Sequence, residues 1–152
     1  YGHGVTVSLL QQVRAYTVFA RDGDMIELSI YKDRAYREPQ RVYSAKTAGQ
    51  MRDMLAKVVE KGGTGFRARV EGYTAAGKTG TAQTGQFDAG GRELLHYWFA
   101  GFYPADAPRY TITVLQDSQQ KPQTSSAALF AQVADALAVL DAAITEKPAE
   151  NS

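Results

Sequence analysis

The chain has 152 residues, about one domain, and its 44% hydrophobic and 22% charged residues make it too apolar for a disordered protein. Its 17 Lys and Arg nearly balance 16 Asp and Glu, for a net charge of +1, so nucleic acid is not expected as a partner. The lack of cysteine excludes disulfides, thiol nucleophiles and cysteine-ligated metals. With only two histidines, neither a metal centre nor another cofactor is expected. No uninterrupted apolar run reaches the ~18 residues of a membrane span.

Two helices and a short strand are predicted in the first part of the chain. A serine followed three residues later by glutamine forms a capping box, which with the apolar spacing predicts a helix over about Ser8–Ala20. Alternation over Ile26–Ile30 predicts a short strand or an extended arm, and the charged segment Lys32–Pro39 predicts a solvated loop. Ser44 is a second helix cap, and this helix should end before Gly62 and Gly63.

The rest of the chain predicts three strands and a helix. The strands are expected at Tyr73–Gln83, His96–Tyr103 and Arg109–Gln116. Their links, a Gly-rich loop at Thr84–Gly91 and a short Pro-bounded turn, are too short for a crossover helix and indicate an antiparallel meander. A helix begins near Ser125, and a polar, disordered tail follows. The predicted fold class is α+β, an antiparallel β-sheet flanked by helices, with a domain over residues 1–143 and a tail over 144–152.

Gly72–Thr79 matches G-x-x-x-x-G-K-[ST], the pattern of a phosphate-binding loop. Such a loop needs a buried strand before it and a helix that begins at the Lys-Thr pair. The segment that follows, Gly80–Gln86, is rich in Gly and Thr, so no helix is expected there. Asp117, the candidate magnesium carboxylate, follows a strand that alternates and is not buried on both faces. Nucleotide binding therefore remains an alternative that the context disfavours.

A second pattern, Lys-Thr-Gly-Thr, shares these residues. On a strand, Thr79 and Thr81 present two hydroxyls to one face. Gly80 permits close approach to the backbone, and Lys78 adds a positive charge, although strict alternation places it on the opposite face. These groups suit a peptide that pairs with the strand edge and ends in a carboxylate. A solvated lysine in a Thr-rich strand is the simpler alternative.

Beyond these letters, the chain resembles the transpeptidase domain of the class B (monofunctional) penicillin-binding proteins. The resemblance covers Tyr1 to about Leu140 and includes four blocks in the family's order. They are a Gly-x-Gly segment leading into a helix, a segment before the catalytic strand, the K-T-G strand and the strand after it: Tyr1–Gln11, Val58–Gly65, Ala76–Gln83 and Phe99–Asp106. The implied fold is the C-terminal part of the penicillin-binding protein/serine β-lactamase-like transpeptidase fold.

The resemblance implies a peptidoglycan D,D-transpeptidase that also binds β-lactams. A serine attacks the D-Ala-D-Ala bond, and an amine of a second stem peptide takes the acyl group from the acyl-enzyme. By position, Lys78 belongs to the polar network of the site, and Thr79 and Thr81 hold the substrate carboxylate on either side of Gly80. The backbone N–H of Thr81 is expected to be one of two oxyanion donors.

The nucleophile is expected outside this chain, because the family's S-x-x-K precedes its Gly-x-Gly segment. Ser29–Lys32 matches S-x-x-K, but its extended pattern makes the match a coincidence. S-x-N is excluded, since Asn151 is the sole asparagine and residue 149 is alanine. The expected partners are an upstream segment with both motifs, stem peptides, β-lactams and proteins of the cell-wall synthesis complex. The resemblance implies the extracytoplasmic side of the bacterial membrane, with an N-terminal anchor. A non-catalytic peptide- or partner-binding module of the same fold remains the main alternative.

Overall fold

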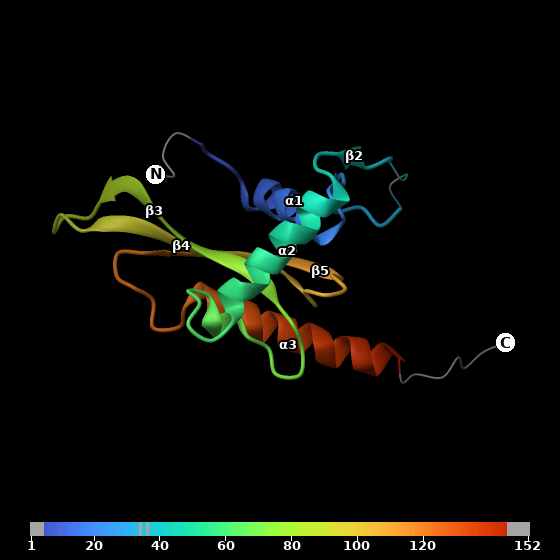
Figure 1. Ribbon diagram of the computed structural model, residues 1–152. Coiled ribbons are helices and arrows are strands. Elements are labelled where there is room, and N and C mark those ends of the chain that lie inside the picture. The colour runs from blue at the N-terminus through green and yellow to red at the C-terminus, as the bar shows by residue number, and fades with distance from the viewer. Residues whose placement is uncertain (1–4, 34, 36, 146–152) are drawn as a thin grey trace.

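The computed structural model describes residues 5–33, 35 and 37–145 and contains helices on both sides of an antiparallel sheet (Figure 1). Three α-helices, one 3₁₀ turn and five strands follow the chain in the order α1 Leu9–Ala20, β1 Asp24–Met25, β2 Gln40–Arg41, α2 Ala45–Val59, η1 Phe66–Ala68, β3 Ala76–Phe87, β4 Glu93–Tyr103, β5 Tyr110–Ser118 and α3 Ser126–Thr145. This arrangement confirms the predicted α+β class.

The main sheet has the order β3-β4-β5, and each strand is antiparallel to the next. Thr79 lies opposite Phe99, and Phe99 lies opposite Val114, so neighbours in the chain are also neighbours in the sheet. This is the predicted meander. Because β3 is an outer strand, one of its edges has no partner strand among the residues described.

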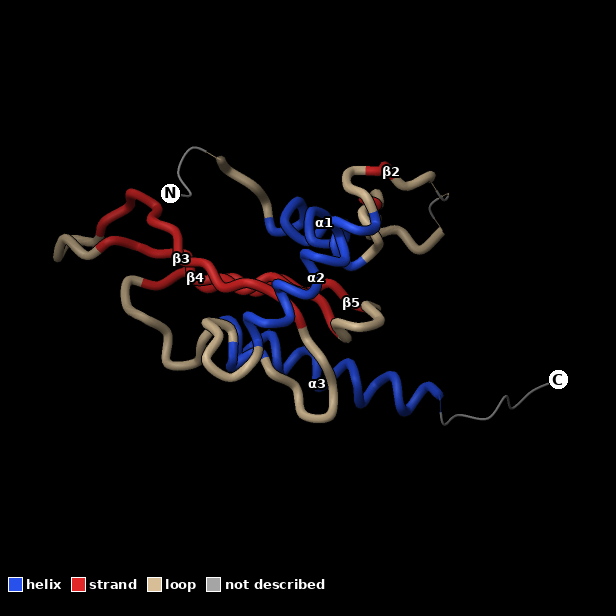
Figure 2. The backbone as a smooth tube through the Cα atoms, in the orientation of Figure 1, coloured by secondary structure: helices blue, strands red, loops and turns tan. Residues whose placement is uncertain are grey.

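The helices cover opposite faces of the sheet, α1 and α2 on one and α3 on the other (Figure 2). On the α3 face, Phe99 and Phe130 are fully buried, with ring centroids 4.8 Å apart. On the other face, Phe102 packs with Leu55 of α2 and with Phe19 of α1. Since successive strand residues point to opposite faces, Thr79 belongs to the α3 face together with its partner Phe99.

Both predicted helix caps are confirmed. Ser8 accepts the backbone N–H of Gln11 at 3.2 Å, and the side chain of Gln11 accepts the N–H of Ser8 at 2.8 Å, which completes the capping box. Ser44 accepts the N–H of Thr47 at 3.1 Å and so caps α2. These local bonds satisfy backbone donors that a helix leaves free at its start.

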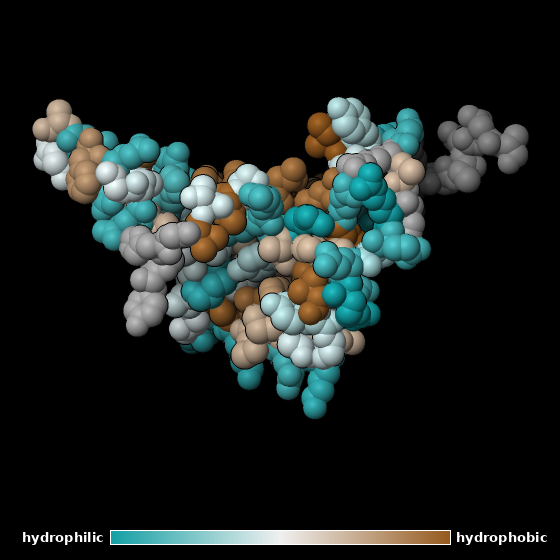
Figure 3. Space-filling view, turned by 90° about the horizontal axis from the view of Figure 1, so that it is seen from above, coloured by the Kyte–Doolittle hydropathy of each residue, from teal (hydrophilic) through white to brown (hydrophobic). Residues whose placement is uncertain are grey.

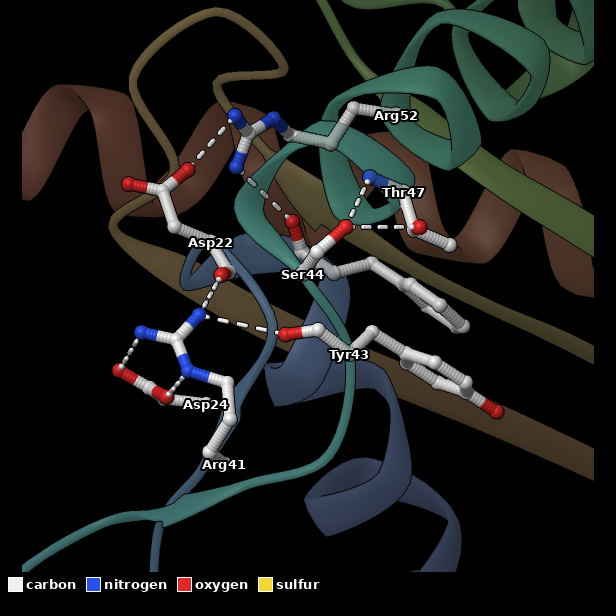
Figure 4. Close-up of polar contacts among 8 residues, drawn as sticks. Asp22, Asp24, Arg41, Tyr43, Ser44, Thr47 and Arg52 are labelled. Carbon is white, nitrogen blue, oxygen red and sulfur yellow. Dashed lines mark hydrogen bonds and ion pairs between the residues drawn. The ribbon is translucent and has the colours of Figure 1, made fainter.

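Arg52 of α2 and Arg41 of β2 bind the end of α1 and the residues just after it (Figure 4). Arg52 donates to the Phe19 carbonyl at 3.1 Å and pairs with Asp22 at 2.8 Å. Arg41 donates to the Asp22 carbonyl and pairs with Asp24 at 2.9 Å. A carbonyl in the last turn of α1 and one just beyond it thus receive charged donors, which link this end of α1 to α2 and to β2.

Two sequence predictions about strands differ from the structure in extent. Ile26–Ile30, predicted as a short strand or an extended arm, pairs with no strand among the described residues, because the pairing is between Asp24–Met25 and Gln40–Arg41. Part of the predicted Thr84–Gly91 loop is strand, because β3 continues to Phe87. Alternation favours a strand, but a strand forms only where another backbone accepts its hydrogen bonds.

A side chain of β4 holds the extended end of β3. Glu93 accepts the N–H of Gly85 and the side-chain amide of Gln83, both at 2.9 Å, across a register shift between Gln83 and Phe87. Thr84 also donates to the Leu94 carbonyl at 2.6 Å. The resulting β3–β4 hairpin projects from the body, at the left of the space-filling view (Figure 3).

Helix α3 extends through Thr145, two residues past the predicted domain limit, and the rest of the predicted tail lies outside the described residues. By length and composition it is also apolar enough to cross a membrane, which the count of uninterrupted apolar residues did not predict.

Asp141 of α3 pairs with Arg109 at 2.9 Å and accepts the Tyr110 hydroxyl at 2.6 Å. That hydrogen bond raises the pKa of the Tyr110 phenol. Through these contacts α3 packs against the sheet.

Candidate active site

The predicted Lys-Thr-Gly-Thr segment lies in β3, next to the unpaired edge of the sheet. Thr79 and Thr81 share the α3 face with Phe99, and the Thr79 hydroxyl lies 3.3 Å from that of Thr64, which precedes η1. Thr79 is half-buried and Thr81 is exposed. The strand therefore offers two neighbouring hydroxyls on one face, as predicted.

The position of Lys78 answers a question that the sequence left open. Alternation places its Cβ on the face opposite Thr79, yet its Nζ donates to the Thr79 carbonyl at 3.0 Å and lies 3.3 Å from the Thr79 hydroxyl. The side chain thus bends around the unpaired edge of β3, so that the ammonium group and the Thr79 hydroxyl are neighbours.

This contact also indicates the direction of the backbone. In an antiparallel ladder, the N–H and C=O of one residue both point to the partner strand or both point away. The Thr79 carbonyl receives Lys78, which places it on the unpaired edge. Thr81, two residues on, has the same orientation, so its N–H also faces that edge. A backbone donor at this edge is available to a developing oxyanion.

A groove of about 590 Å³ adjoins these residues. The turn between α2 and η1 forms one wall, and the segment between β5 and α3 forms another. Its floor belongs to β3 and β4. The lining residues are Gly63, Thr64, Phe66, Arg67, Thr79, Gly80, Thr81, Tyr97, Trp98, Lys121, Pro122, Gln123 and Ser125. The predicted residues Thr79, Gly80 and Thr81 therefore share one concave site, which has the size of a small-molecule or peptide pocket.

Gly80 is required for a reason that the sequence did not show. A Cβ at this position would lie 2.0 Å from Cε2 of Trp98, its cross-strand neighbour in β4. The indole therefore occupies the space above the glycine. The structure thus adds close approach of Trp98 as a second reason for glycine, while the predicted close approach of a ligand to the backbone stays a prediction.

The phosphate-loop alternative is contradicted by the structure. Gly72–Thr79 leads from a turn directly into β3, and the strand continues to Phe87. Lys78 therefore lies inside a strand, and no helix N-terminus follows it to face a phosphate.

Ser29–Lys32 is likewise not a catalytic pair on a helix. The Ser29 hydroxyl bonds the N–H of Tyr31 at 3.0 Å and its carbonyl at 3.1 Å, within a local bend. Ser29 lines a different cavity from the one beside Thr79. This agrees with the prediction that its motif is a coincidence.

Sequence reasoning missed a buried serine behind the groove. Ser126, the first residue of α3, is buried, and its hydroxyl lies 2.8 Å from both the Tyr97 carbonyl and Oε1 of Gln116. Tyr97 is the register partner of Thr81. Ser126 therefore links the start of α3 to the strand beside the Lys-Thr-Gly-Thr segment. The sequence predicted a helix that begins near its neighbour Ser125, but no local pattern marks the contact of Ser126 with β4.

Comparison with known proteins places this geometry in a family. Residues 1–135 match the penicillin-binding protein transpeptidase domain. The chain belongs to the penicillin-binding protein transpeptidase family. This confirms the resemblance given by the four sequence blocks.

Relatives and solved structures agree with this membership. The chain is 38% identical over 120 residues to a protein of Neisseria flavescens named "Probable peptidoglycan D,D-transpeptidase PenA", covering 77% of the chain. It is also 38% identical over 156 residues to the penicillin-binding protein PbpB of Mycolicibacterium smegmatis, covering 88% of the chain. Penicillin-binding protein 3 of Mycobacterium tuberculosis, in its complex with aztreonam, matches 93% of the chain with a TM-score of 0.76 and 34% identity.

The chain spans only part of these proteins. It covers 29% and 24% of the two curated relatives, and 37% of the aztreonam complex. Family membership therefore concerns one portion of a transpeptidase domain, the portion that carries the K-T-G strand.

Proposed function

We propose that this chain supplies the K-T-G side of the active site of a peptidoglycan D,D-transpeptidase. The observation that carries the proposal is the Lys78 ammonium, brought around the unpaired edge of β3 onto the carbonyl and hydroxyl of Thr79. A cation and hydroxyls at a strand edge can hold the terminal carboxylate of an extended peptide.

Each site residue then has a distinct role. Lys78 provides positive charge to the carboxylate and belongs to the proton-transfer network, while Thr79 and Thr81 hold the carboxylate with their hydroxyls. The Thr81 N–H stabilises the negative oxygen that forms when the serine attacks the D-Ala-D-Ala carbonyl. The peptide bond then breaks, the terminal D-Ala leaves as an amine that takes up the proton removed from the serine, and a serine ester forms. The amine of a second stem peptide attacks this ester, loses a proton and takes the acyl group, which restores the serine hydroxyl.

The other components follow from the family. We propose that an upstream segment of the same protein provides S-x-x-K and S-x-N, and that the site also accepts β-lactams. The aztreonam complex of the mycobacterial structural neighbour supports the second point. We further propose action on the extracytoplasmic side of the membrane, held by an N-terminal anchor, in cell-wall biogenesis that determines cell shape and involves other cell-wall synthesis proteins.

A labelled penicillin tests the proposal on the full protein that carries this segment. After proteolysis, mass spectrometry should find the label on a serine outside residues 1–152, and Ser29→Ala should leave labelling intact. Label on Ser29 would overturn the assignment. If penicillin and D-Ala-D-Ala peptides bind but no serine is acylated, the non-catalytic module is the better explanation.

A further inference from the structure

The groove is larger than the site of a terminal carboxylate. Its volume of about 590 Å³ lies within the range of pockets, roughly 300–1,000 Å³, that enclose a whole small ligand. Residues of β3 and β4, Thr79 and Thr81 among them, form its floor, and its walls come from η1 and from loops that the proposed function does not use. These segments also determine the charge of the groove.

The charged side chains that line the groove are cationic. Arg67 from η1 and Lys121 from the segment after β5 both line the groove, while no aspartate or glutamate is among its lining residues in the described part of the chain. Both side chains are exposed, and neither forms an ion pair or a side-chain hydrogen bond with another described residue.

Five other arginines have an acidic partner. They pair with a carboxylate at 2.8–2.9 Å: Arg37, Arg41, Arg52, Arg92 and Arg109. The cations of the groove come from segments more than fifty positions apart in the sequence, and folding gathers them without a protein counter-charge among the described residues. An anionic ligand would provide that counter-charge.

The groove also has apolar side chains. Phe66, Tyr97 and Pro122 contribute to its lining, and Phe66 is 43% exposed. The indole of Trp98 lies over Gly80, on the opposite face of the sheet. An occupant with an aliphatic chain that ends in a negative group would bury the chain on the aromatic rings and bring the charge to Arg67 and Lys121.

The direction of β3 suggests which ligand reaches the groove. A peptide that pairs with the unpaired edge of β3 places every second side chain on the face of Thr79 and Thr81. The groove opens on these same residues. Side chains that precede the scissile bond can therefore enter it while the terminal carboxylate stays beside Lys78.

We propose that Arg67 and Lys121 form a second anion-binding subsite, which selects donor peptides with an acidic side chain upstream of the terminal D-Ala-D-Ala. This inference rests on the proposed function and adds the specificity of the same site. It assigns the charged loops to substrate selection and not to the acyl-transfer step.

Matched peptides test the inference on the full protein. Each pair ends in D-Ala-D-Ala and differs in one side chain, a carboxylate or its carboxamide, placed in turn at the three residues before D-Ala-D-Ala. At one position, kcat/KM should favour the carboxylate by about 1.5- to fivefold, the scale for an exposed ion pair. Salt near 0.5 M should reduce this ratio, because exposed charges are screened.

Variants identify the groups responsible. The double variant Arg67→Gln, Lys121→Gln should bring the carboxylate-to-carboxamide ratio close to one. The matched control Lys61→Gln removes an exposed cation that does not line the groove, so it should retain the wild-type ratio.

The outcomes separate the two hypotheses. A wild-type ratio of one at every position, or a ratio that the double variant leaves unchanged, would overturn the subsite while peptide turnover continues. Absence of both peptide turnover and penicillin labelling would overturn the proposed function, and the subsite with it.

Discussion

Replacing Lys78 and Thr81 separately should produce losses of different size in the acylation rate. Lys78→Ala removes a charge from carboxylate binding and from the proton-transfer network, and positioned acid–base groups typically contribute about 10²–10⁴-fold. Thr81→Val removes one hydroxyl but keeps the backbone N–H of the oxyanion site. A lost polar partner costs roughly 1–3 kcal/mol, and because Thr81 is exposed, we expect a loss near the lower limit.

The structure also predicts that both variants fold. Lys78 is exposed and its two contacts are to the neighbouring residue, while Thr81 is outside the core. The assay is stopped-flow acylation of the full protein by a fluorescent penicillin, with thermal denaturation of each variant in parallel. An unchanged acylation rate in a folded Lys78→Ala protein would refute the assignment of β3 as the catalytic strand.

Two further predictions concern stability. Gly80→Ala should lower the free energy of unfolding by about 1–3 kcal/mol, the usual cost of overpacking, because the new Cβ would clash with Trp98. Gly49→Ala in α2 is the control: a Cβ there meets no atom within 4 Å, so denaturation should show no loss. Residues 1–152 expressed alone should self-associate in light scattering, because Val5, Leu10, Leu140 and Ile144 are exposed; a monomer with a cooperative thermal transition would contradict this.

Local chemistry made the helices and the site strand predictable. The capping box at Ser8 and the cap at Ser44 are bonds within four residues of sequence, so the residue types alone determine them. The three strands are joined by short links, which limited their pairing to a meander. Residues of the Lys-Thr-Gly-Thr segment could be assigned to a strand because glycine and threonine disfavour the alternative helix.

Features that depend on distant residues could not be predicted in this way. The extension of β3 to Phe87 requires Glu93, which bonds Gly85 only after the hairpin has closed. The side chain that leaves no room for a Cβ at Gly80 is an indole 18 positions further along the chain. Arg67 and Lys121 meet at one groove through the packing of two loops, and neither has a neighbour in sequence that indicates a binding site.

The tip of the β3–β4 hairpin should be acid-labile because of Asp88. This carboxylate accepts the N–H groups of Arg92 and Gly90 at 2.8 and 2.9 Å and pairs with the Arg92 guanidinium at 2.9 Å. The backbone bond from Arg92 is the largest cause that lowers the pKa of Asp88 below 3.8. A carboxyl with a lowered pKa stabilises the folded state above its unfolded pKa, and this stabilisation is lost as the pH falls through the folded value.

Hydrogen exchange of residues 87–93, corrected for the intrinsic rate at each pH, should show protection at pH 5 that is lost below about pH 3.8. Asp88→Asn cannot gain a charge, so its protection should already be low at pH 5 and change little on acidification. Equal protection of the wild type and Asp88→Asn at pH 5, or the same loss of protection in both on acidification, would show that the carboxylate does not hold the hairpin tip.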